Sequence, residues 1–392
     1  MLNLFIKKSG ALVFHCINFF VSLVFPKSKC LWLYGEWFGN RFDDNSSYAF
    51  RAKSEKAIRK VWITKNKKLL EEIVAKGYEC YLAYSLYGLY LQARAGVFFC
   101  SVNSKDFCFS SINPRCVVIQ LWHGLPIKKI GFDVKEERWI KRVLLAIRRH
   151  TIDSYDYILS PSSSFDHIFC SAFKVKEDNI IHCAYPRCDG FMVNDDTRDC
   201  LRNQLNIDTK YIFFYLPTHR NEGKSGWKIK GLIDDMKRLN GFLQTHDITV
   251  IIKPHYYENQ NYEEECCGNV KIVKNLPFGL YESLGCSDGL ITDYSSVCLD
   301  YIFTGNPIFF YMPDLESYLN GDRESYFDLN EIVCAPCADV SSLMREIDFF
   351  VKHGKKKEYL RLAINRNFLP GSISGEFQKI AEELINGNQK AK

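Results

Sequence analysis

The stretch Leu121-Trp122-His123-Gly124-Leu125-Pro126-Ile127-Lys128-Lys129 follows a short apolar run, Cys-Val-Val-Ile, at residues 116–119. Such a run is typical of a strand that is buried on both faces of a parallel sheet. The glycine, proline and lysines after it indicate that the strand ends there and the chain turns. A histidine directly after a strand lies where an open α/β sheet places its ligand-binding crevice. A core histidine packed beside Trp122 is the alternative that spacing alone leaves open.

Short apolar runs alternate with amphipathic stretches along the whole chain. The predicted strands cover residues 31–34, 61–64, 78–84, 97–100, 117–121, 157–160 and 180–184, with helical stretches such as 67–76 and 86–95 between them. After a polar break near 190–210, predicted strands resume at 211–216, 249–252, 270–273, 289–292 and 307–311. This pattern predicts an α/β fold with two Rossmann-like domains facing across a cleft, at residues 29–195 and 196–392, the second including C-terminal helices. A chain of 392 residues is long enough for two such domains.

The first thirty residues form a separate feature. Residues 11–25, ALVFHCINFFVSLVF, are apolar and are flanked by lysines on both sides. As a helix they would span about 22 Å, which is short of the roughly 30 Å of bilayer hydrocarbon. The polar residues Lys8, His15, Asn18 and Ser22 share one helical face. Residues 1–28 therefore predict a helix on an anionic membrane surface, as in a peripheral protein on the cytoplasmic face; a helix packed on the protein's own core is the alternative.

Basic residues concentrate just after the opening stretch. Residues 128–150 carry eight Lys or Arg against three Asp or Glu, a local excess equal to the +5 of the whole chain. Such a patch favours a partner with negative charge, either phosphate or an anionic membrane. No nucleic-acid partner is predicted, because the basic residues lack interleaved aromatics in a recognised module. Apolar residues at helical spacing within the segment indicate either a second membrane-contacting helix or a basic solvated face over a core-facing stripe.

The cysteines do not predict a metal site. The sixteen cysteines are scattered through apolar runs, which favours buried, reduced thiols. The pair Cys334 and Cys337 has no second ligand pair at zinc spacing.

Polar and charged side chains follow the predicted strands at several places. With their neighbours Trp122, Gly124 and Pro217, they are His123 and Arg187 in the first half, and Thr218, His219, Arg220, Lys253, His255, Thr292, Asp293, Ser295, Ser296 and Asp300 in the second. Because the carboxyl ends of parallel strands share one sheet edge, these residues are expected to line a crevice. The Ser and Thr hydroxyls at residues 292–296 lie at a strand-to-helix turn, which predicts a phosphate site at the helix N-terminus. Simple helix capping is a compatible alternative.

Taken together, these elements resemble the CDP-glycerol glycerophosphotransferases, the teichoic-acid primases and polymerases with a two-Rossmann (GT-B) architecture. The matching elements stand in family order over about residues 31–330: 44–45, 122–129, 185–189, 217–220, 253–255, 291–296, 307–311 and 326–328. The resemblance implies transfer of a polyol phosphate, first of all glycerol phosphate, from a CDP-activated donor, with release of CMP. It implies an undecaprenyl-diphosphate-linked or glycan acceptor and a role in the synthesis of teichoic-acid or capsule-like polymers.

The resemblance also implies roles for the residues above. His123 and His255 fall on the family's two functional histidines, and we expect His123 to be the base on the acceptor side and His255 to contact the donor phosphates. We predict that substrate is bound by Trp122, Gly124, Arg187, Pro217, Thr218, Arg220, Lys253, Thr292, Asp293, Ser295, Ser296 and Asp300. No cofactor is firmly implied; a divalent cation at Asp293 is possible, but one acidic residue does not make a metal site. His219, Cys188 and Arg323-Glu324 differ from the residues that the family usually has at these positions, so the resemblance does not identify the donor polyol.

Two other functions stay open at this point. A nucleotide-sugar glycosyltransferase would have the same architecture, and it would release a nucleoside diphosphate and form a glycosidic bond. The protein could instead be a non-catalytic membrane-bound scaffold. In that case the Ser, Thr and His residues at the strand ends would have no catalytic role, and the protein would bind no nucleotide.

Overall fold

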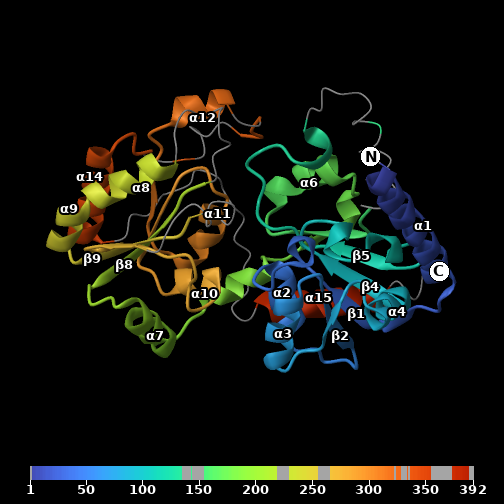
Figure 1. Ribbon diagram of the computed structural model, residues 1–392. Coiled ribbons are helices and arrows are strands. Elements are labelled where there is room, and N and C mark those ends of the chain that lie inside the picture. Colours follow the sequence, from blue (N-terminus) through green and yellow to red (C-terminus); the bar gives the residue numbers. More distant parts are fainter. Residues whose placement is uncertain are drawn as a thin grey trace. The chain divides into compact units, whose positions relative to one another are not determined.

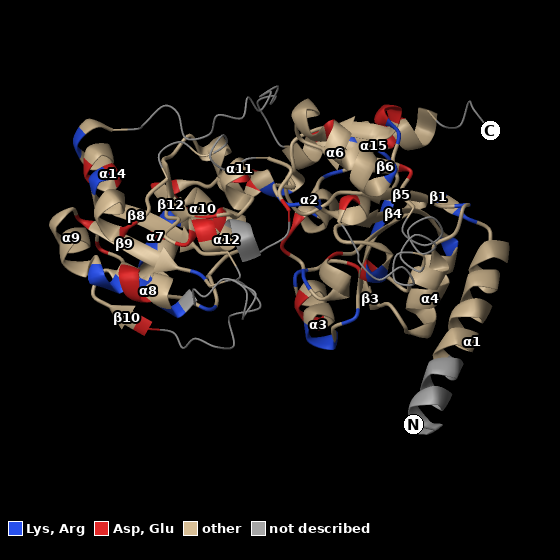
Figure 2. Cartoon of the chain, turned by 90° about the horizontal axis from the view of Figure 1, so that it is seen from above, with Lys and Arg blue, Asp and Glu red and all other residues tan. Residues whose placement is uncertain are grey.

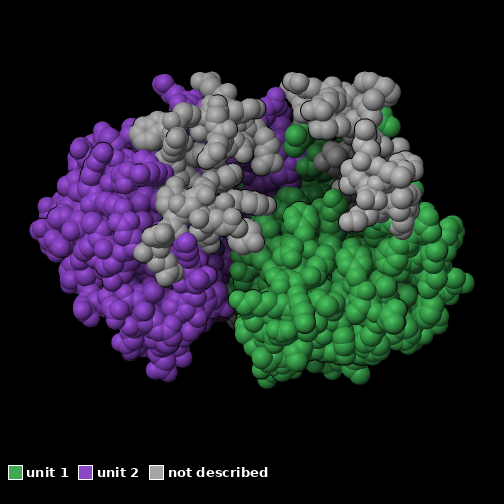
Figure 3. Space-filling model, in the orientation of Figure 1, with its two compact units in different colours: residues 1–123, 131–189, 365–392 green, residues 124–130, 190–364 purple. Residues whose placement is uncertain are grey.

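A computed structural model describes residues 2–134, 143, 154–218, 229–254, 265–321, 324–327, 333, 336–354 and 373–387. The chain divides into two compact units (Figure 3). Unit 1 contains residues 1–123, 131–189 and 365–392, and unit 2 contains residues 124–130 and 190–364. Each unit is built around its own mainly parallel sheet, so the two halves of the predicted alternation correspond to two separate cores.

The sheet of unit 1 has seven parallel strands in the order β3-β2-β1-β4-β5-β6-β7 (Figure 1). The strands are β1 (Ser28–Tyr34), β2 (Arg59–Thr64), β3 (Cys80–Leu82), β4 (Ala95–Cys100), β5 (Val117–Gln120), β6 (Tyr157–Ser160) and β7 (Ile180–His182). Chain order reverses between β1 and β4, which are neighbours. This pair is the topological switch point, where an open α/β sheet leaves a crevice beyond the strand ends.

The helices of unit 1 are α1 (Leu2–Val24), α2 (Asn45–Arg51), α3 (Lys67–Ala75), α4 (Leu86–Arg94), α6 (Asp166–Phe173) and α15 (Ile373–Gly387). Short 3-10 helices used below are η1 (Trp37–Gly39), η2 (Ser104–Asp106), η3 (Phe109–Ser111) and η7 (Pro186–Phe191). Among the residues described, no helix is both long enough and apolar enough to cross a bilayer. Most of the basic segment 128–150 lies outside the described residues.

The sheet of unit 2 has the order β10-β11-β9-β8-β12-β13. Its strands are β8 (Tyr211–Leu216), β9 (Ile248–Ile252), β10 (Glu265–Cys267), β11 (Val270–Ile272), β12 (Gly289–Thr292) and β13 (Ile308–Phe310), and only β10 runs antiparallel to its neighbour. The helices are α7 (Asp195–Leu205), α8 (Ile229–Arg238), α9 (Asn240–Thr245), α10 (Leu280–Gly285), α11 (Val297–Tyr301), α12 (Leu315–Gly321) and α14 (Val340–His353). The switch point of this sheet lies between β8 and β12.

The structure contains a strand at each of the twelve predicted positions and adds β10. The three residues of β10, Glu-Cys-Cys, carry no alternating apolar pattern, so the sequence offers no signal for this short edge strand.

The C-terminal helix departs from the expected domain boundary. We expected residues 196–392 to form the second domain, but α15 belongs to unit 1. The carboxylate of Asp189 accepts hydrogen bonds from the backbone N–H groups of Ile373 (2.6 Å) and Ser374 (3.0 Å) and from the Ser374 hydroxyl. Phe377 packs edge-on against Phe99 of β4 at 6.1 Å between ring centroids. These contacts join segments far apart in sequence, which no local pattern could reveal.

Candidate active site

The site residues of unit 1 come from the loops that follow β1, β4 and β5. Glu36 and Trp37 follow β1, Ser101 follows β4, and His123 follows β5. The side chain of Gln120, at the end of β5, accepts a hydrogen bond from the Trp122 N–H at 2.9 Å. The strand order therefore brings three loops together at the switch point, as the position of His123 after a strand predicted.

His123 is held in one tautomer. Its Nδ1 lies 2.8 Å from the carbonyl oxygen of Ser101. A carbonyl oxygen can only accept, so Nδ1 carries the hydrogen and the lone pair is on Nε2. The imidazole lies against the rings of Trp122 and Trp37, at 4.0 and 5.2 Å between centroids. Burial lowers the pKa of His123 below its usual value. The side chain is therefore neutral at pH 7 and has the protonation state that a general base needs.

A buried ion pair joins Asp44 to Arg187. The two side chains meet at 2.8 Å and are almost fully buried. Asp44 also accepts a hydrogen bond from the Trp37 indole N–H at 2.7 Å. Burial alone would raise the pKa of Asp44, but the positive charge of Arg187 and the proximity of His123 outweigh it and hold that pKa below its ordinary value. Asp44 is consequently a charged residue of the site, and Arg187 is its ion-pair partner. The role of Arg187 in donor binding stays a prediction.

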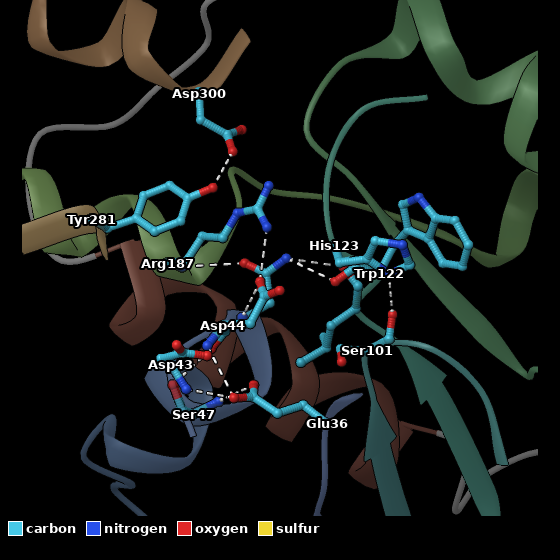
Figure 4. A network of polar contacts seen from close by, with 12 residues as sticks. Glu36, Asp43, Asp44, Ser47, Ser101, Trp122, His123, Arg187, Tyr281 and Asp300 are labelled. Carbon is cyan, nitrogen blue, oxygen red and sulfur yellow. Dashed lines mark hydrogen bonds and ion pairs between the residues drawn. The ribbon is translucent and has the colours of Figure 1, made fainter. Parts of the chain in front are cut away.

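Asn45 connects the loop of His123 to the loop of Arg187. Its side-chain N–H donates to the carbonyl oxygens of Trp122 (2.9 Å) and Leu121 (3.3 Å), and its side-chain oxygen accepts from the backbone N–H of Arg187 (3.2 Å). Figure 4 shows the resulting network from Ser101 through His123 to Asp44 and Arg187. Trp122, His123 and Arg187, predicted from separate motifs, are thus brought together around the start of α2.

Two buried carboxylates near the site were not predicted. Glu36 is fully buried and accepts hydrogen bonds from the backbone N–H groups of Asp43, Asp44 and Ser47. Asp106 accepts from the N–H groups of three residues, 38, 101 and 102, and burial raises its pKa to about 6. The position of Glu36 two residues after the strand was an available signal, but Asp106 lies in η2 with no strand-end signal.

Several residues near His123 have a strained backbone conformation. Trp37, Phe38 and Trp122 have φ values of 46°, 59° and 53°. This left-handed conformation is uncommon for residues other than glycine, and it is typical of functional sites that the surrounding fold holds in place. Gly124, with φ of 138°, adopts a conformation that only glycine reaches readily.

Unit 2 carries a second cluster at its own switch point. The backbone N–H of Thr218, after β8, donates to both carboxylate oxygens of Asp293, after β12, at 3.0 and 3.1 Å. The Thr218 hydroxyl donates to the same carboxylate at 2.5 Å. Thr292 donates from its hydroxyl to the carbonyl of Leu216, the residue before Pro217, at 3.1 Å. Four predicted residues, Pro217, Thr218, Thr292 and Asp293, therefore lie together.

The other predicted residues of unit 2 hold varied positions. Ser295 and Ser296 are half-buried in the turn before α11, and Ser295 accepts from the backbone N–H of Val297 at 3.4 Å. Asp300 is buried and accepts from the Tyr281 hydroxyl at 2.6 Å. Lys253 directly follows β9, and its backbone N–H donates a hydrogen bond to the carbonyl oxygen of Tyr215 at 3.0 Å. Among the residues described, no group of three metal-ligating side chains occurs.

The opening stretch is divided between the two units. Trp122 and His123 belong to unit 1, whereas residues 124–130 belong to unit 2. There the carbonyl of Ile127 accepts from the Tyr326 N–H and the Ser325 hydroxyl, both at 2.9 Å. The Tyr326 hydroxyl accepts from the N–H of Ile130 at 3.2 Å. Two motifs that are about 200 residues apart in sequence thus form one paired segment.

Some predicted site residues lie outside the described part of the chain. They are His255 and Arg220, and the motif residues His219 and Asp328 lie there too. The roles predicted for His255 and Arg220 therefore stay predictions.

Two Rossmann-like units, each with polar residues at its switch point, define the GT-B class of transferase folds. Residues 17–390 match the family model of CDP-Glycerol:Poly(glycerophosphate) glycerophosphotransferase. The chain belongs to this family, and both the resemblance and the predicted two-Rossmann fold class are confirmed.

Several curated relatives are similar to the chain. It is 30% identical over 291 residues to the teichoic acid poly(glycerol phosphate) polymerase of Bacillus subtilis (strain 168), covering 71% of this chain and 38% of that protein. It is 31% identical over 241 residues to the teichoic acid ribitol-phosphate primase of Bacillus spizizenii, covering 59% of this chain and 60% of that protein. The chain thus spans less than two thirds of the length of these two relatives.

Solved structures show the same fold. The wall teichoic acid polymerase TagF aligns with a TM-score of 0.74 at 20% identity over 99% of this chain and 97% of that chain. The UDP-GlcNAc 2-epimerase from Neisseria meningitidis aligns with a TM-score of 0.55 at 11% identity over 92% of this chain and 100% of that chain.

Proposed function

We propose that this protein transfers glycerol phosphate from CDP-glycerol to a hydroxyl group of a growing teichoic acid, with release of CMP. Membership of the glycerophosphotransferase family supports this reaction class. The observation that carries the proposal is the tautomer of His123, which keeps an unprotonated Nε2 in a buried site at the switch point of unit 1.

In the proposed reaction His123 acts as the general base. The acceptor oxygen attacks the phosphorus that bears glycerol, and the bond from this phosphorus to the bridging oxygen breaks. CMP leaves with the bonding electron pair, and the proton of the acceptor hydroxyl passes to Nε2. An alcohol has a very high pKa, so a base at its proton assists as the new O–P bond forms. Lowering of the His123 pKa by burial keeps the base unprotonated before the transfer.

The donor is assigned to unit 2. The Thr218–Asp293 pair holds together the ends of β8 and β12, where a sheet of this topology binds nucleotides. Ser295 and Ser296 follow directly and supply hydroxyl groups for the diphosphate. Lys253 adds a positive charge after the neighbouring strand, which suits a leaving group that gains negative charge.

The acceptor that we propose is a lipid-linked polymer precursor carried on undecaprenyl diphosphate, or its glycan portion. The relatives include both glycerol-phosphate and ribitol-phosphate enzymes, so the donor panel must contain both polyols.

The test is incubation of the full chain with CDP-glycerol, CDP-ribitol or UDP-N-acetylglucosamine and a lipid-linked acceptor, with the products identified by mass spectrometry. The expected result is CMP and a phosphodiester product with CDP-glycerol, and loss of both products in His123→Ala. A nucleoside diphosphate together with a glycosidic product would replace the proposal by a glycosyltransferase. Absence of nucleotide binding would favour the non-catalytic scaffold.

A further inference from the structure

The N-terminal helix α1 is attached to unit 1 by its polar face. Asn18 donates to the hydroxyls of Ser110 and Ser111, both at 2.9 Å, and Ser22 donates to the carbonyl of Ser111 at 2.7 Å. His15 contacts the Ser110 hydroxyl at 2.9 Å through Nδ1. His15, Asn18 and Ser22 of the polar stripe therefore face the protein, and Asn18 and Ser22 are buried beneath the helix.

The apolar face of α1 is consequently turned outward. Leu12, Ile17, Phe20 and Val24 are 66%, 58%, 64% and 77% exposed. A helix normally buries such residues and exposes its polar stripe, so this orientation is the reverse of the arrangement in a soluble globular protein. The buried hydrogen bonds hold the helix in this orientation, because rotating it would leave several polar groups without partners.

A second helix extends the same apolar surface. α4 lies beside α1 (Figures 1 and 2). Leu86 at its start is 90% exposed, and Tyr87 and Tyr90 are 44% and 45% exposed. The rings of Tyr90 and Phe25 lie 6.1 Å apart, so the two elements are in contact. We call this the α1–α4 surface, and its outward side chains are Leu12, Ile17, Phe20, Val24, Leu86, Tyr87 and Tyr90.

The charges around the α1–α4 surface indicate what covers it. Residues 1–35 contain four lysines and no Asp or Glu, and residues 80–100 contain one arginine and no acidic residue. Residues 11–24 of α1 contain no Lys, Arg, Asp or Glu, and this part of the helix is tan throughout in Figure 2. The Arg59–Glu79 ion pair beside the Tyr87 hydroxyl adds no net charge. An apolar face edged by tyrosines and by a net positive charge matches the interface of an anionic bilayer, where aromatic rings sit at headgroup level. A second copy of this chain would present the same positive charges and would be repelled.

We propose that the α1–α4 surface docks this protein on an anionic lipid bilayer, with α1 lying in the interface and α4 contributing its tyrosines. The sequence favoured a membrane-surface helix, and the structure adds the lipid-facing residues, the second helix and the internal hydrogen bonds that present them. The proposal is independent of the reaction, because docking is measured without any substrate.

The test measures partition of the full chain onto vesicles of equal parts phosphatidylglycerol and phosphatidylcholine, and onto phosphatidylcholine vesicles alone. The wild type should float with the anionic vesicles and about tenfold less with the neutral ones. Ile17→Glu/Phe20→Glu should lose about tenfold or more of the binding, because two large apolar side chains no longer enter the bilayer. Leu86→Glu/Tyr90→Glu should also weaken it.

The matched control is Met192→Glu/Phe349→Glu, which adds the same charge at exposed apolar residues of unit 2 and should bind like the wild type. Unchanged thermal melting would show that the α1 variant still folds, since its replaced side chains point outward. Full binding by the α1 variant, or equal loss in the control, would overturn the proposal. If Leu86→Glu/Tyr90→Glu bound vesicles like the wild type, α4 would not contact the bilayer, and the proposal that both helices dock would be overturned. If the protein dimerised in the absence of vesicles and Ile17→Glu/Phe20→Glu abolished the dimer, the surface would be a dimer interface instead.

Discussion

The carbonyl oxygen of Ser101 lies 2.8 Å from Nδ1 of His123, and these residues follow the neighbouring strands β4 and β5. This relationship decides which imidazole nitrogen can accept a proton. The loop that carries Ser101 is held in turn by Asp106, which accepts the N–H groups of Ser101 and Val102. The chemistry of His123 therefore depends on the backbone of an adjacent strand.

Replacement of His123 by glutamine should lower turnover by about 10²–10⁴-fold, which is the usual range for loss of a general base. The measurement is CMP release from CDP-glycerol at saturating acceptor. His182→Gln is the matched control, because this partly exposed histidine pairs with Asp166 at the sheet edge and should keep near-normal turnover. Near-normal turnover in His123→Gln would remove the base assignment.

The pH dependence of kcat/KM should show an acid limb below pH 6.5. Burial lowers the pKa of His123, so protonation removes the base only at lower pH than for an ordinary histidine. The unfolded chain protonates this group near 6.5 while the folded protein keeps it neutral, so this histidine should reduce stability as pH falls through 6.5. A rate profile with an acid limb above pH 7 would contradict the expected direction.

The Asp44–Arg187 pair should be strongly coupled. Asp44→Asn or Arg187→Gln should each lower the free energy of unfolding by about 3–5 kcal/mol, because each leaves a buried group without its charged partner. The double variant should cost less than the sum of the two. Urea unfolding measures all three. The exposed pair Arg59–Glu79 is the control, and Arg59→Gln should cost about 0–1 kcal/mol. Additive losses at Asp44 and Arg187 would show that the two side chains act independently.

Thr218→Val should weaken binding of CDP-glycerol roughly tenfold, because the lost hydroxyl leaves Asp293 with one fewer hydrogen bond and loosens the β8 and β12 ends. Thr218→Ser keeps the hydroxyl and should restore most of the affinity. Calorimetric titration measures both. Thr209→Val removes a hydroxyl that bonds Thr249 at 2.8 Å elsewhere in unit 2, and should leave affinity unchanged. Equal affinity in the valine and serine variants of Thr218 would exclude a role for the hydroxyl.

Lys60 should make stability depend on pH. Burial lowers its pKa to about 7, although its ammonium donates to the carbonyls of Ala49 (3.0 Å) and Ala52 (2.7 Å) and to Gln378 (2.6 Å) of α15. Between pH 7 and about 10.5 the unfolded chain binds a proton that the folded protein has released. The unfolding free energy of the wild type relative to Lys60→Met should therefore rise with pH in this window, by up to about 1.4 kcal/mol per unit. Urea unfolding at pH 6 and 9 tests this, and parallel curves for the two proteins would contradict it.

The architecture and the position of the first site could be predicted because both depend on local patterns. Apolar runs alternating with amphipathic stretches indicate parallel strands, and parallel strands place their carboxyl ends along one edge. His123, Thr218 and Asp293 were identified for this reason, and in the structure each lies within three residues of the end of a strand. Asp106 was missed, since it acts through backbone N–H groups of other loops rather than through a strand-end position.

Local periodicity therefore determined where the strands lie in the chain, their division into two halves and the residues at the strand ends, whereas the strand order within each sheet came from the tertiary structure. Only the tertiary structure decided the tautomer of His123, the pairing of Asp44 with Arg187, the return of α15 to unit 1 and the direction of the α1 stripe. Each of these depends on a partner from a distant segment: Ser101, Arg187, Asp189 and Ser111. A hydrogen bond between segments that far apart leaves no periodic trace in either one, so its consequences appear only when the chain is folded.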